Sequence, residues 1–348
     1  MIMGGGTGGH VFPGLAVAGE LRARGWRVVW LGARGGMEAT LVPGHGYEMA
    51  WVNFAGLRGK GPVALALLPA RLLLAFWQAA RAIFAHRPDV VLGMGGYQSF
   101  PGGMMAALLN RPLVLHEQNS VAGLANRVLA RVADRILCAF PGALKGAAVT
   151  GNPVRPDIAS LPAPAGRYGA RSGPLKLLVI GGSLGAKVLN ETVPQALSLM
   201  PPERRPEVTH QSGGQHIDAL MRRYRELGVY AIALAFIDDM ASAYGAADVV
   251  LCRAGALTVA ELEAAGVASV LVPYPHAVDD HQTGNARHLS DAGAAILLPQ
   301  AELTPERLTA LLSEFTRTGL AEMAGRARAL ARPDATRAVA QACVELAR

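Results

Sequence analysis

Hydrophobic positions in the first half of the chain form short apolar runs separated by longer segments of helical period. The apolar runs have strand length and lie at residues 1–3, 27–31, 89–92, 113–116 and 135–139. The helical segments lie at residues 12–23, 69–86 and 122–132. Alternation of buried strands and helices predicts an α/β fold with a parallel sheet. The first strand is short, which leaves the position of the natural N-terminus open.

The same pattern restarts after a stretch rich in proline and glycine at residues 151–173. A strand at 175–180 again leads into a glycine loop and a helix at 186–200. Further strands are predicted at residues 208–211, 231–236, 249–252, 269–272 and 295–298. We therefore expect two Rossmann-like domains, at residues 1–155 and 156–332, facing each other across a cleft. The final segment, 333–348, is expected to return to the first domain as a helix.

Composition and charge limit the classes of function. The chain has 348 residues, of which 51% are apolar and 17% charged, and its formal net charge is +7. A basic surface favours anionic partners. The sequence contains no zinc-finger spacing and no basic block, so nucleic acid is not an expected partner. The cysteines Cys138, Cys252 and Cys343 are far apart, which argues against a disulfide framework.

Neither a signal peptide nor a membrane-spanning helix is expected. Glycines between residues 4 and 9 interrupt any apolar run at the start. The most apolar region, 63–84, is interrupted by Pro69, Arg71 and Arg81. About 20 consecutive apolar residues would be needed to cross a bilayer.

The first glycine loop matches a dinucleotide-binding pattern only in part. Gly4, Gly6 and Gly9 have the G-x-G-x-x-G spacing, but the second strand ends without the acidic residue that would hold a ribose. The loop still places backbone amides at a helix N-terminus, where an anion can bind. His10 closes the loop and is either a general base or a structural histidine.

Three later segments carry candidate binding groups. The loop at 181–186 adds the hydroxyl of Ser183, although close packing of helix on strand would also explain its glycines. In segment 255–261, Thr258 is expected near a helix start, and Glu261 one turn later could accept hydrogen bonds from a ribose or simply favour the helix dipole. The polar loop 279–285 contains Gln282, suited to sugar hydroxyls or to solvent. No D-x-D pattern occurs, so nothing requires a metal ion or another cofactor.

Together these segments resemble the MurG family. The resemblance is carried by motifs that follow one another in the expected order through nearly the whole chain, at residues 4–10, 93–97, 116–119, 151–155, 181–183, 236–240 and 255–261. It implies a GT-B fold with an N-terminal acceptor domain and a C-terminal donor domain. The implied reaction is inverting transfer of N-acetylglucosamine (GlcNAc) from UDP-GlcNAc to undecaprenyl-pyrophosphoryl-MurNAc-pentapeptide in peptidoglycan synthesis.

The resemblance also implies roles for individual residues. Thr7, Gly8, Gly9 and Asn119 are expected near the transferred sugar, and Arg155 and Ser183 near the donor diphosphate. Ile237 is expected at the uracil, Glu261 at the ribose and Gln282 at the sugar. The phosphate-binding helix start comprises Ala256, Leu257 and Thr258, with Val259 and Ala260 continuing the segment. His10 is the candidate base.

The resemblance further implies a peripheral protein at the cytoplasmic face of the inner membrane, with an anionic membrane surface and other cell-wall synthesis proteins as candidate partners. The helix expected at 69–86 carries the apolar residues Leu72, Leu73, Phe76, Trp77 and Ile83, next to Arg71 and Arg81 and downstream of Arg58 and Lys60. Such a helix can lie in a membrane interface or face an ordinary core.

Three alternative functions remain for comparison. A UDP-GlcNAc 2-epimerase would share the fold and the donor site without needing a lipid acceptor. A nicotinamide-dependent dehydrogenase is disfavoured by the missing acidic residue. A purely structural membrane protein would have no need for two glycine loops, a phosphate-type helix start and a polar sugar-binding loop.

Overall fold

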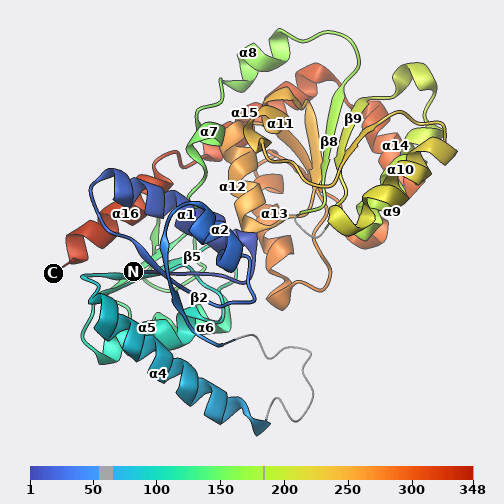
Figure 1. Cartoon of the computed structure of the whole chain (residues 1–348). Helices are drawn as coiled ribbons and strands as arrows, with labels where there is room; N and C mark the ends of the chain where they lie inside the picture. The colour runs from blue at the N-terminus through green and yellow to red at the C-terminus, as the bar shows by residue number, and fades with distance from the viewer. Residues whose placement is uncertain (55–65, 183–184, 348) are drawn as a thin grey trace. The chain divides into compact units, whose positions relative to one another are not determined.

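The computed structural model describes residues 1–54, 66–182 and 185–347, and Ser183, Arg58 and Lys60 lie outside these ranges. The chain forms two compact units, the first comprising Met1–Arg155 with Pro333–Arg348 and the second Pro156–Arg332. Each unit is built around its own parallel sheet (Figure 1). Two Rossmann-like α/β sheets confirm the predicted fold class.

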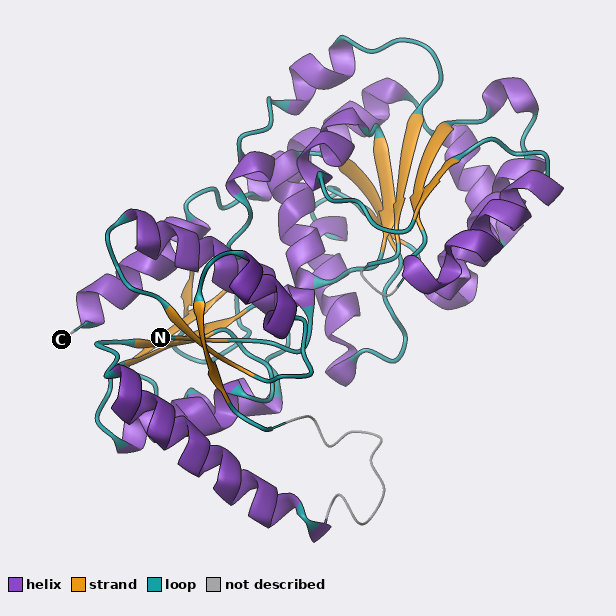
Figure 2. Cartoon of the chain, viewed as in Figure 1, coloured by secondary structure: helices purple, strands orange, loops and turns teal. Residues whose placement is uncertain are grey.

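The first unit contains a seven-stranded sheet in the order β3-β2-β1-β4-β5-β6-β7. Its strands are β1 (Ile2–Met3), β2 (Val29–Gly32), β3 (Glu48–Trp51), β4 (Val91–Gly93), β5 (Leu113–Glu117), β6 (Arg135–Cys138) and β7 (Ala148–Val149). Its helices are α1 (Gly8–Ala23), α2 (Glu38–Gly44), α4 (Leu68–His86), α5 (Ser99–Leu108), α6 (Leu124–Leu129) and α16 (Ala335–Leu346). Figure 2 shows helices on both sides of this sheet.

Alternating side chains on each strand of the first unit build two cores, one on each face of the sheet. On β5, Leu113 and Leu115 pack in a cluster with residues of α4, α5 and α6. Val114, between them, points to the other face and packs with residues of α1 and α16. Because both faces are covered, the strands consist of nearly continuous apolar residues.

The second unit contains a six-stranded sheet in the order β10-β9-β8-β11-β12-β13. Its strands are β8 (Lys176–Ile180), β9 (Glu207–Gln211), β10 (Ile232–Leu234), β11 (Val249–Cys252), β12 (Ala268–Leu271) and β13 (Ile296–Leu297). Its helices are α7 (Pro156–Ala159), α8 (Pro164–Gly169), α9 (Lys187–Leu199), α10 (Ile217–Glu226), α11 (Met240–Ala246), α12 (Ala256–Ala265), α13 (His281–Ser290), α14 (Pro305–Glu314) and α15 (Arg317–Leu330).

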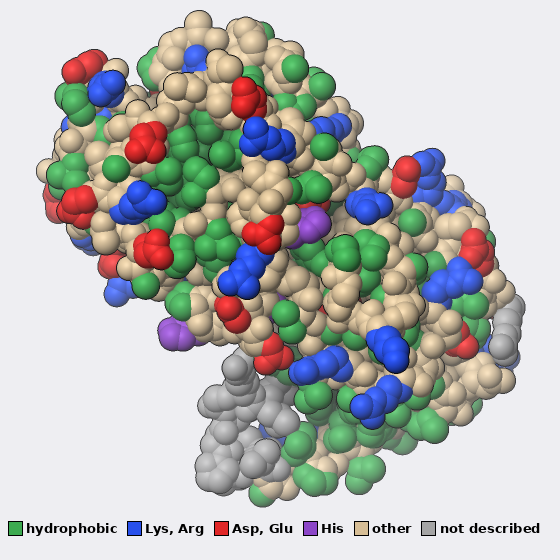
Figure 3. All heavy atoms as spheres, turned by 180° about the vertical axis from the view of Figure 1, so that it is seen from behind, with side chains coloured by type: hydrophobic (Ala, Val, Ile, Leu, Met, Phe, Trp, Pro, Cys, Tyr) green, Lys and Arg blue, Asp and Glu red, His purple; other side chains and the backbone are tan. Residues whose placement is uncertain are grey.

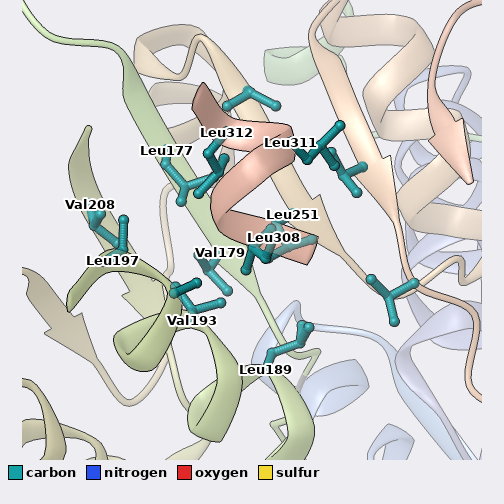
Figure 4. Close-up of a cluster of buried hydrophobic side chains, with 14 of the residues drawn as sticks. Leu177, Val179, Leu189, Val193, Leu197, Val208, Leu251, Leu308, Leu311 and Leu312 are labelled. Carbon is teal, nitrogen blue, oxygen red and sulfur yellow. The ribbon is translucent and has the colours of Figure 1, made fainter. Parts of the chain in front are cut away.

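A leucine- and valine-rich core holds α9 and α14 on this sheet. Leu177 and Val179 of β8 point into a cluster with Leu189 of α9 and Leu308 of α14 (Figure 4). These side chains are almost completely buried. Burial of each leucine or valine contributes about 1.5–3 kcal/mol, so this core fixes the position of β8 in the sheet.

A buried carboxylate, Asp248, connects elements near the N-terminal ends of the central strands of the same sheet. Asp248 is fully buried and accepts hydrogen bonds from Arg171 at 2.6 Å, from Arg317 at 3.3 Å and from the backbone N–H of Lys176 at 2.9 Å. Although burial alone would raise the pKa of Asp248, these hydrogen bonds lower it below its ordinary value. The carboxylate therefore stays ionised and joins β8, β11 and α15 at a point remote from the strand carboxyl ends.

Two details of the sequence analysis need correction. The stretch 151–173 is not a plain linker, because Pro156 and Pro164 are the first residues of α7 and α8, where a missing N–H costs nothing. The helix predicted at 122–132 is shorter and comprises only α6, since Gly123 is its N-cap. Among the helices in the described part of the chain, none is long and apolar enough to cross a membrane.

Candidate active site

In each sheet the strand order changes direction between two central strands, and one principal candidate segment follows such a strand. In the first unit this point lies between β1 and β4, and in the second between β8 and β11. The first glycine loop follows β1, and the α12 N-terminus follows β11. Ligands of open α/β sheets bind outside the carboxyl ends of the strands at such points.

The first glycine loop leads directly from β1 into α1. Gly6 has a φ of +86°, a conformation that favours glycine. Thr7 is the extended N-cap of α1, and Gly8, Gly9 and His10 form its first turn. The structure therefore brings four of the predicted residues, Thr7 to His10, together at the end of β1.

A carboxylate of the chain itself occupies part of this loop. Glu38, fully buried at the start of α2, accepts hydrogen bonds from the backbone N–H of Gly6 at 2.9 Å and of Ala33 at 3.0 Å, and from Nε2 of Gln98 at 2.7 Å. A Cβ atom on Gly5 would lie 1.8 Å from Nε2 of Gln98 and 2.3 Å from Oε1 of Glu38, so a side chain there would displace this hydrogen-bonded pair. The amide of Gly6, which we expected to be open to an anion, is thus already bound.

His10 belongs to a chain of hydrogen bonds in the first unit. Its Nδ1 lies 3.0 Å from Oε1 of Gln118, and Nε2 of Gln118 lies 3.1 Å from Nδ1 of His116. Nε2 of His116 lies 3.0 Å from the backbone oxygen of Gly151. Complete burial lowers the pKa of His116 to about 4, so this ring is neutral near pH 7.

Asn119 and Arg155, the other candidates of the first unit, lie close to this chain in sequence. Oε1 of Glu117 accepts hydrogen bonds from the backbone N–H of Asn119 at 2.9 Å and from its side-chain amide at 3.3 Å. The guanidinium of Arg155 lies over the ring of Phe12, 5.8 Å from its centroid. Phe12 follows the glycine loop in α1, so the structure places Arg155 beside α1.

The α12 N-terminus is the principal candidate phosphate site of the second unit. Gly255 is the N-cap, with an extended backbone, and Ala256, Leu257 and Thr258 form the first turn. Because Gly255 has no side chain, the first-turn N–H groups receive no side-chain cap from it. No acidic residue lies in this turn, so the helix dipole favours an anionic ligand there. Val259 and Ala260 continue the helix with buried side chains.

Glu261 is almost completely buried, one turn into α12. The hydroxyl of Tyr244, on α11, donates a hydrogen bond to its Oε2 at 3.0 Å. Burial, together with the charge of Glu261, raises the pKa of the neighbouring Cys252 to about 12. A buried carboxylate held by a tyrosine can accept hydrogen bonds from a sugar diol.

The polar segment 279–285 is mainly helical, contrary to the predicted loop. Gln282 lies in the first turn of α13, and its Oε1 accepts a hydrogen bond from the backbone N–H of Tyr274 at 2.8 Å. Asn285 is fully buried and donates to the backbone oxygen of Ala254 at 3.1 Å, which connects α13 to the segment before α12. Asn285 is therefore a structural residue, and the amide nitrogen of Gln282 remains a candidate donor.

Two candidates of the second unit remain. Ile237, buried after β10, precedes the N-cap Asp239, whose carboxylate accepts a hydrogen bond from the backbone N–H of Ser242 at 2.9 Å. Nε2 of Gln211 donates to the backbone oxygen of Gly182 at 3.0 Å, which connects the second glycine loop to β9. Ser183 itself lies outside the described residues.

Sequence reasoning missed three residues that contact the candidates. Glu38 was overlooked because the acidic residue was sought at the end of β2, whereas it lies in the next helix. Gln118 belongs to the motif at residues 116–119 but was given no role of its own, and Tyr244 lies on a different helix from Glu261. Within the described ranges, no cluster of three histidine, cysteine, aspartate or glutamate residues is suited to a metal ion.

The chain matches known families over most of its length. Residues 1–138 match the glycosyltransferase family 28 N-terminal domain, and residues 176–340 match the glycosyltransferase family 28 C-terminal domain. A relative from Dechloromonas aromatica, named UDP-N-acetylglucosamine--N-acetylmuramyl-(pentapeptide) pyrophosphoryl-undecaprenol N-acetylglucosamine transferase, is 62% identical over 100% of this chain and 99% of its own length.

Solved structures of similar fold include a member of the same family. The crystal structure of MurG from Acinetobacter baumannii is 41% identical, covers 99% of both chains and has a TM-score of 0.86. The glycosyltransferase of kitacinnamycin, at 20% identity and a TM-score of 0.72 over 100% of this chain and 98% of its own, shares the fold. On this evidence the chain belongs to glycosyltransferase family 28 and, within it, to the MurG family.

Proposed function

We propose that this protein transfers N-acetylglucosamine from UDP-GlcNAc to the C4 hydroxyl of MurNAc in undecaprenyl-pyrophosphoryl-MurNAc-pentapeptide, with inversion. The observation that carries the proposal is the 62% identity, over the whole chain, to a transferase named for this reaction. The second unit supports it with a helix N-terminus suited to a diphosphate and with Glu261 suited to a ribose.

The proposed roles divide between the units. The second unit binds UDP-GlcNAc through the α12 N-terminus, Glu261, Gln282, Ile237 and Ser183. The first unit binds the acceptor, and its glycine loop and Asn119 lie beside the transferred sugar. Arg155, at the end of the first unit, is the candidate cation for the donor diphosphate.

The proposed chemistry is a single displacement. The acceptor C4 oxygen forms a bond to C1 of the sugar, the bond from C1 to the UDP oxygen breaks, and the hydroxyl proton passes to His10. Negative charge develops on the departing diphosphate, where the N–H groups of the α12 first turn stabilise it. None of these roles requires a metal ion.

Transfer of labelled GlcNAc to a short-chain analogue of the lipid acceptor tests the proposal, with His10→Ala alongside. Product from the native chain and a loss of about 100-fold or more in the variant are expected if His10 is the base. Equal rates would retain the reaction and reject His10. Release of free N-acetylmannosamine without transfer would favour the epimerase.

We also propose that the protein docks peripherally on the cytoplasmic face of the inner membrane through α4. Leu73, Trp77 and Phe84 are 69%, 58% and 65% exposed on this helix. Exposed Arg81 stacks on Trp77, with 5.8 Å between the guanidinium and the ring centroid. Ile83, predicted to share this apolar face, is instead buried in the core.

The surface around α4 has the mixture expected of a membrane-binding face. Figure 3 shows hydrophobic side chains gathered at the lower end of that view, with Lys and Arg side chains above them. Apolar side chains insert into the interface while arginines contact anionic headgroups. Charge reversal at Arg71 and Arg81 should weaken binding to anionic vesicles, and undiminished binding would reject the electrostatic part. Any contact with other cell-wall synthesis proteins would be tested separately, by co-purification.

A further inference from the structure

The side chain of Gln118 joins two histidines of the first unit. Its Oε1 lies 3.0 Å from Nδ1 of His10, whereas its Nε2 lies 3.1 Å from Nδ1 of His116 and 3.3 Å from the backbone oxygen of His116. We propose that Gln118 is a positioning residue that holds His10 with its proton on Nδ1, so that Nε2 presents its lone pair to the acceptor hydroxyl. This inference rests on the proposed function, in which His10 is the base.

The orientation of the Gln118 amide follows from its surroundings. The backbone oxygen of His116 can only accept a hydrogen bond, so the amide nitrogen, which donates, must face it. Rotating the amide by 180° would place two oxygens in contact and leave a buried N–H group without an acceptor. Gln118 is only 1% exposed, which makes such a loss costly. Oε1 therefore faces His10.

The tautomer of His116 agrees with this orientation. Burial keeps His116 neutral, with its pKa lowered to about 4, so the ring carries one N–H. Its Nε2 lies 3.0 Å from the backbone oxygen of Gly151, which can only accept. The proton is therefore on Nε2, and Nδ1 of His116 accepts from Gln118.

The same reasoning determines the tautomer of His10, at the other end of this chain of hydrogen bonds. Oε1 of Gln118 carries no proton, so its hydrogen bond to His10 requires a proton on Nδ1 of that ring. In the neutral form of the ring, which a general base requires, the lone pair is then on Nε2, and among the described residues no hydrogen bond is formed at that atom. A backbone carbonyl, at Gly151, thus determines through two side chains which nitrogen of His10 can take a proton.

Gly95 permits this arrangement. It has a φ of +87°, and a Cβ atom there would lie 2.9 Å from both Nδ1 and Cε1 of His10 and 3.3 Å from Oε1 of Gln118. A side chain at residue 95 would therefore separate His10 from Gln118. In the Ser-His-Asp triad a carboxylate has this orienting task. Here a neutral amide sets the tautomer without adding a negative charge beside the base.

The first experiment needs no variant for its main readout. The full chain is labelled with ¹⁵N-histidine, and long-range ¹H–¹⁵N spectra are recorded at the pH of the transfer assay, with His10→Ala identifying the His10 signals. We expect protonated Nδ1 and unprotonated Nε2. A native protein that transfers GlcNAc with His10 protonated on Nε2 would overturn this inference while leaving the proposed function intact. Absence of transfer by the native chain would reject the proposed function itself.

Variants of Gln118 then test the link to catalysis. Gln118→Met removes the acceptor, so the Nδ1–H tautomer should lose its dominance. We expect kcat to fall about 10- to 100-fold, as for the hydrogen-bond partners that orient metal-bound histidines, with KM for UDP-GlcNAc changing less than about twofold. Gln98→Met is the matched control, because it alters a buried glutamine bound to Glu38 and should leave the His10 tautomer unchanged. An equal change of the His10 tautomer in both variants would indicate that either substitution disturbs the packing of the first unit, and it would overturn the inference.

The conservative variant separates positioning from packing. Gln118→Glu keeps an acceptor opposite Nδ1 of His10. Its other oxygen faces both Nδ1 and the backbone oxygen of His116, so His116 is expected to take up a proton on Nδ1, and the variant should be less stable than the native chain. The variant should retain the Nδ1–H tautomer, recover part of the kcat lost in Gln118→Met and move the acidic limb of the pH profile of kcat/KM upward. If the two variants lose kcat equally and the acidic limb does not move, Gln118 has only a packing role.

Discussion

Replacing Glu38 with glutamine should destabilise the first unit and slow transfer together. Glu38 accepts three hydrogen bonds, with Oε2 bound to Gly6 and Oε1 bound to both Ala33 and Gln98. A glutamine has one oxygen and one NH₂ group, so it cannot accept at both positions. The least disruptive arrangement turns the NH₂ group toward the N–H of Gly6, which then loses its acceptor.

The size of the effect follows from these three contacts. Loss of the bond to Gly6 costs about 1.5–3 kcal/mol because the acceptor is a carboxylate. The two remaining bonds change from charged to neutral acceptors, which costs roughly 1 kcal/mol each. A total near 4 kcal/mol corresponds to a midpoint about 8–16 °C lower for a unit of this size. The loop that carries Thr7 to His10 would lose its anchor as well.

Calorimetry of the full chain measures the expected loss of stability, and the transfer assay measures the expected loss of rate. Glu20→Gln is the matched control, because Glu20 forms a partly exposed salt bridge with Arg24 at 2.7 Å that contributes about 0–1 kcal/mol. Glu38→Gln should also reduce kcat with little change in KM for UDP-GlcNAc. A thermal midpoint no lower than that of Glu20→Gln would refute the reasoning.

Three further outcomes are expected. Tyr244→Phe removes the hydrogen bond to Glu261 and should weaken UDP-GlcNAc binding about 5- to 10-fold in titration calorimetry, and unchanged affinity would reject the ribose assignment. Burial lowers the pKa of His210 to about 3, so the unfolded chain binds the proton first as pH falls, and the contribution of His210 to the free energy of unfolding should drop by about 2 kcal/mol from pH 7.5 to pH 5. A His210→Gln variant with the same pH slope in urea denaturation would contradict this. Combined Trp77→Ser and Phe84→Ser should reduce binding to anionic vesicles at least about 10-fold while leaving transfer to a soluble acceptor analogue unchanged, and a loss of both would point to misfolding.

The central strands could be predicted from the sequence because parallel strands buried on both faces consist of apolar runs. β11 was predicted with its observed bounds, Val249–Cys252. The edge strands β3 (Glu48–Trp51) and β7 (Ala148–Val149) were missed, since each is short and partly exposed and its pairing depends on a neighbour. These two strands lack the apolar continuity that makes the central strands recognisable.

The candidate site, like the sheets, could be predicted from the sequence only where its features are local. Glycine loops and a helix start can be recognised because each is local in sequence. The partners that orient them cannot, because Gln118 lies 108 residues from His10 and Glu38 lies 32 residues from Gly6. Only the folded sheet, which brings the ends of β1, β4 and β5 together, gives these residues a common function.

The first glycine loop and the α12 N-terminus differ in charge, although each leads from a central strand into a helix. In the first unit the N–H of Gly6 is bound to the carboxylate of Glu38, so an added phosphate would meet a negative charge already in place. In the second unit the first turn of α12 contains no acidic residue, and its N-cap Gly255 offers no side-chain acceptor. A diphosphate is therefore favoured at α12 and disfavoured beside Gly6. This difference supports the proposed division in which the second unit binds the nucleotide and the first unit presents a base to a neutral hydroxyl.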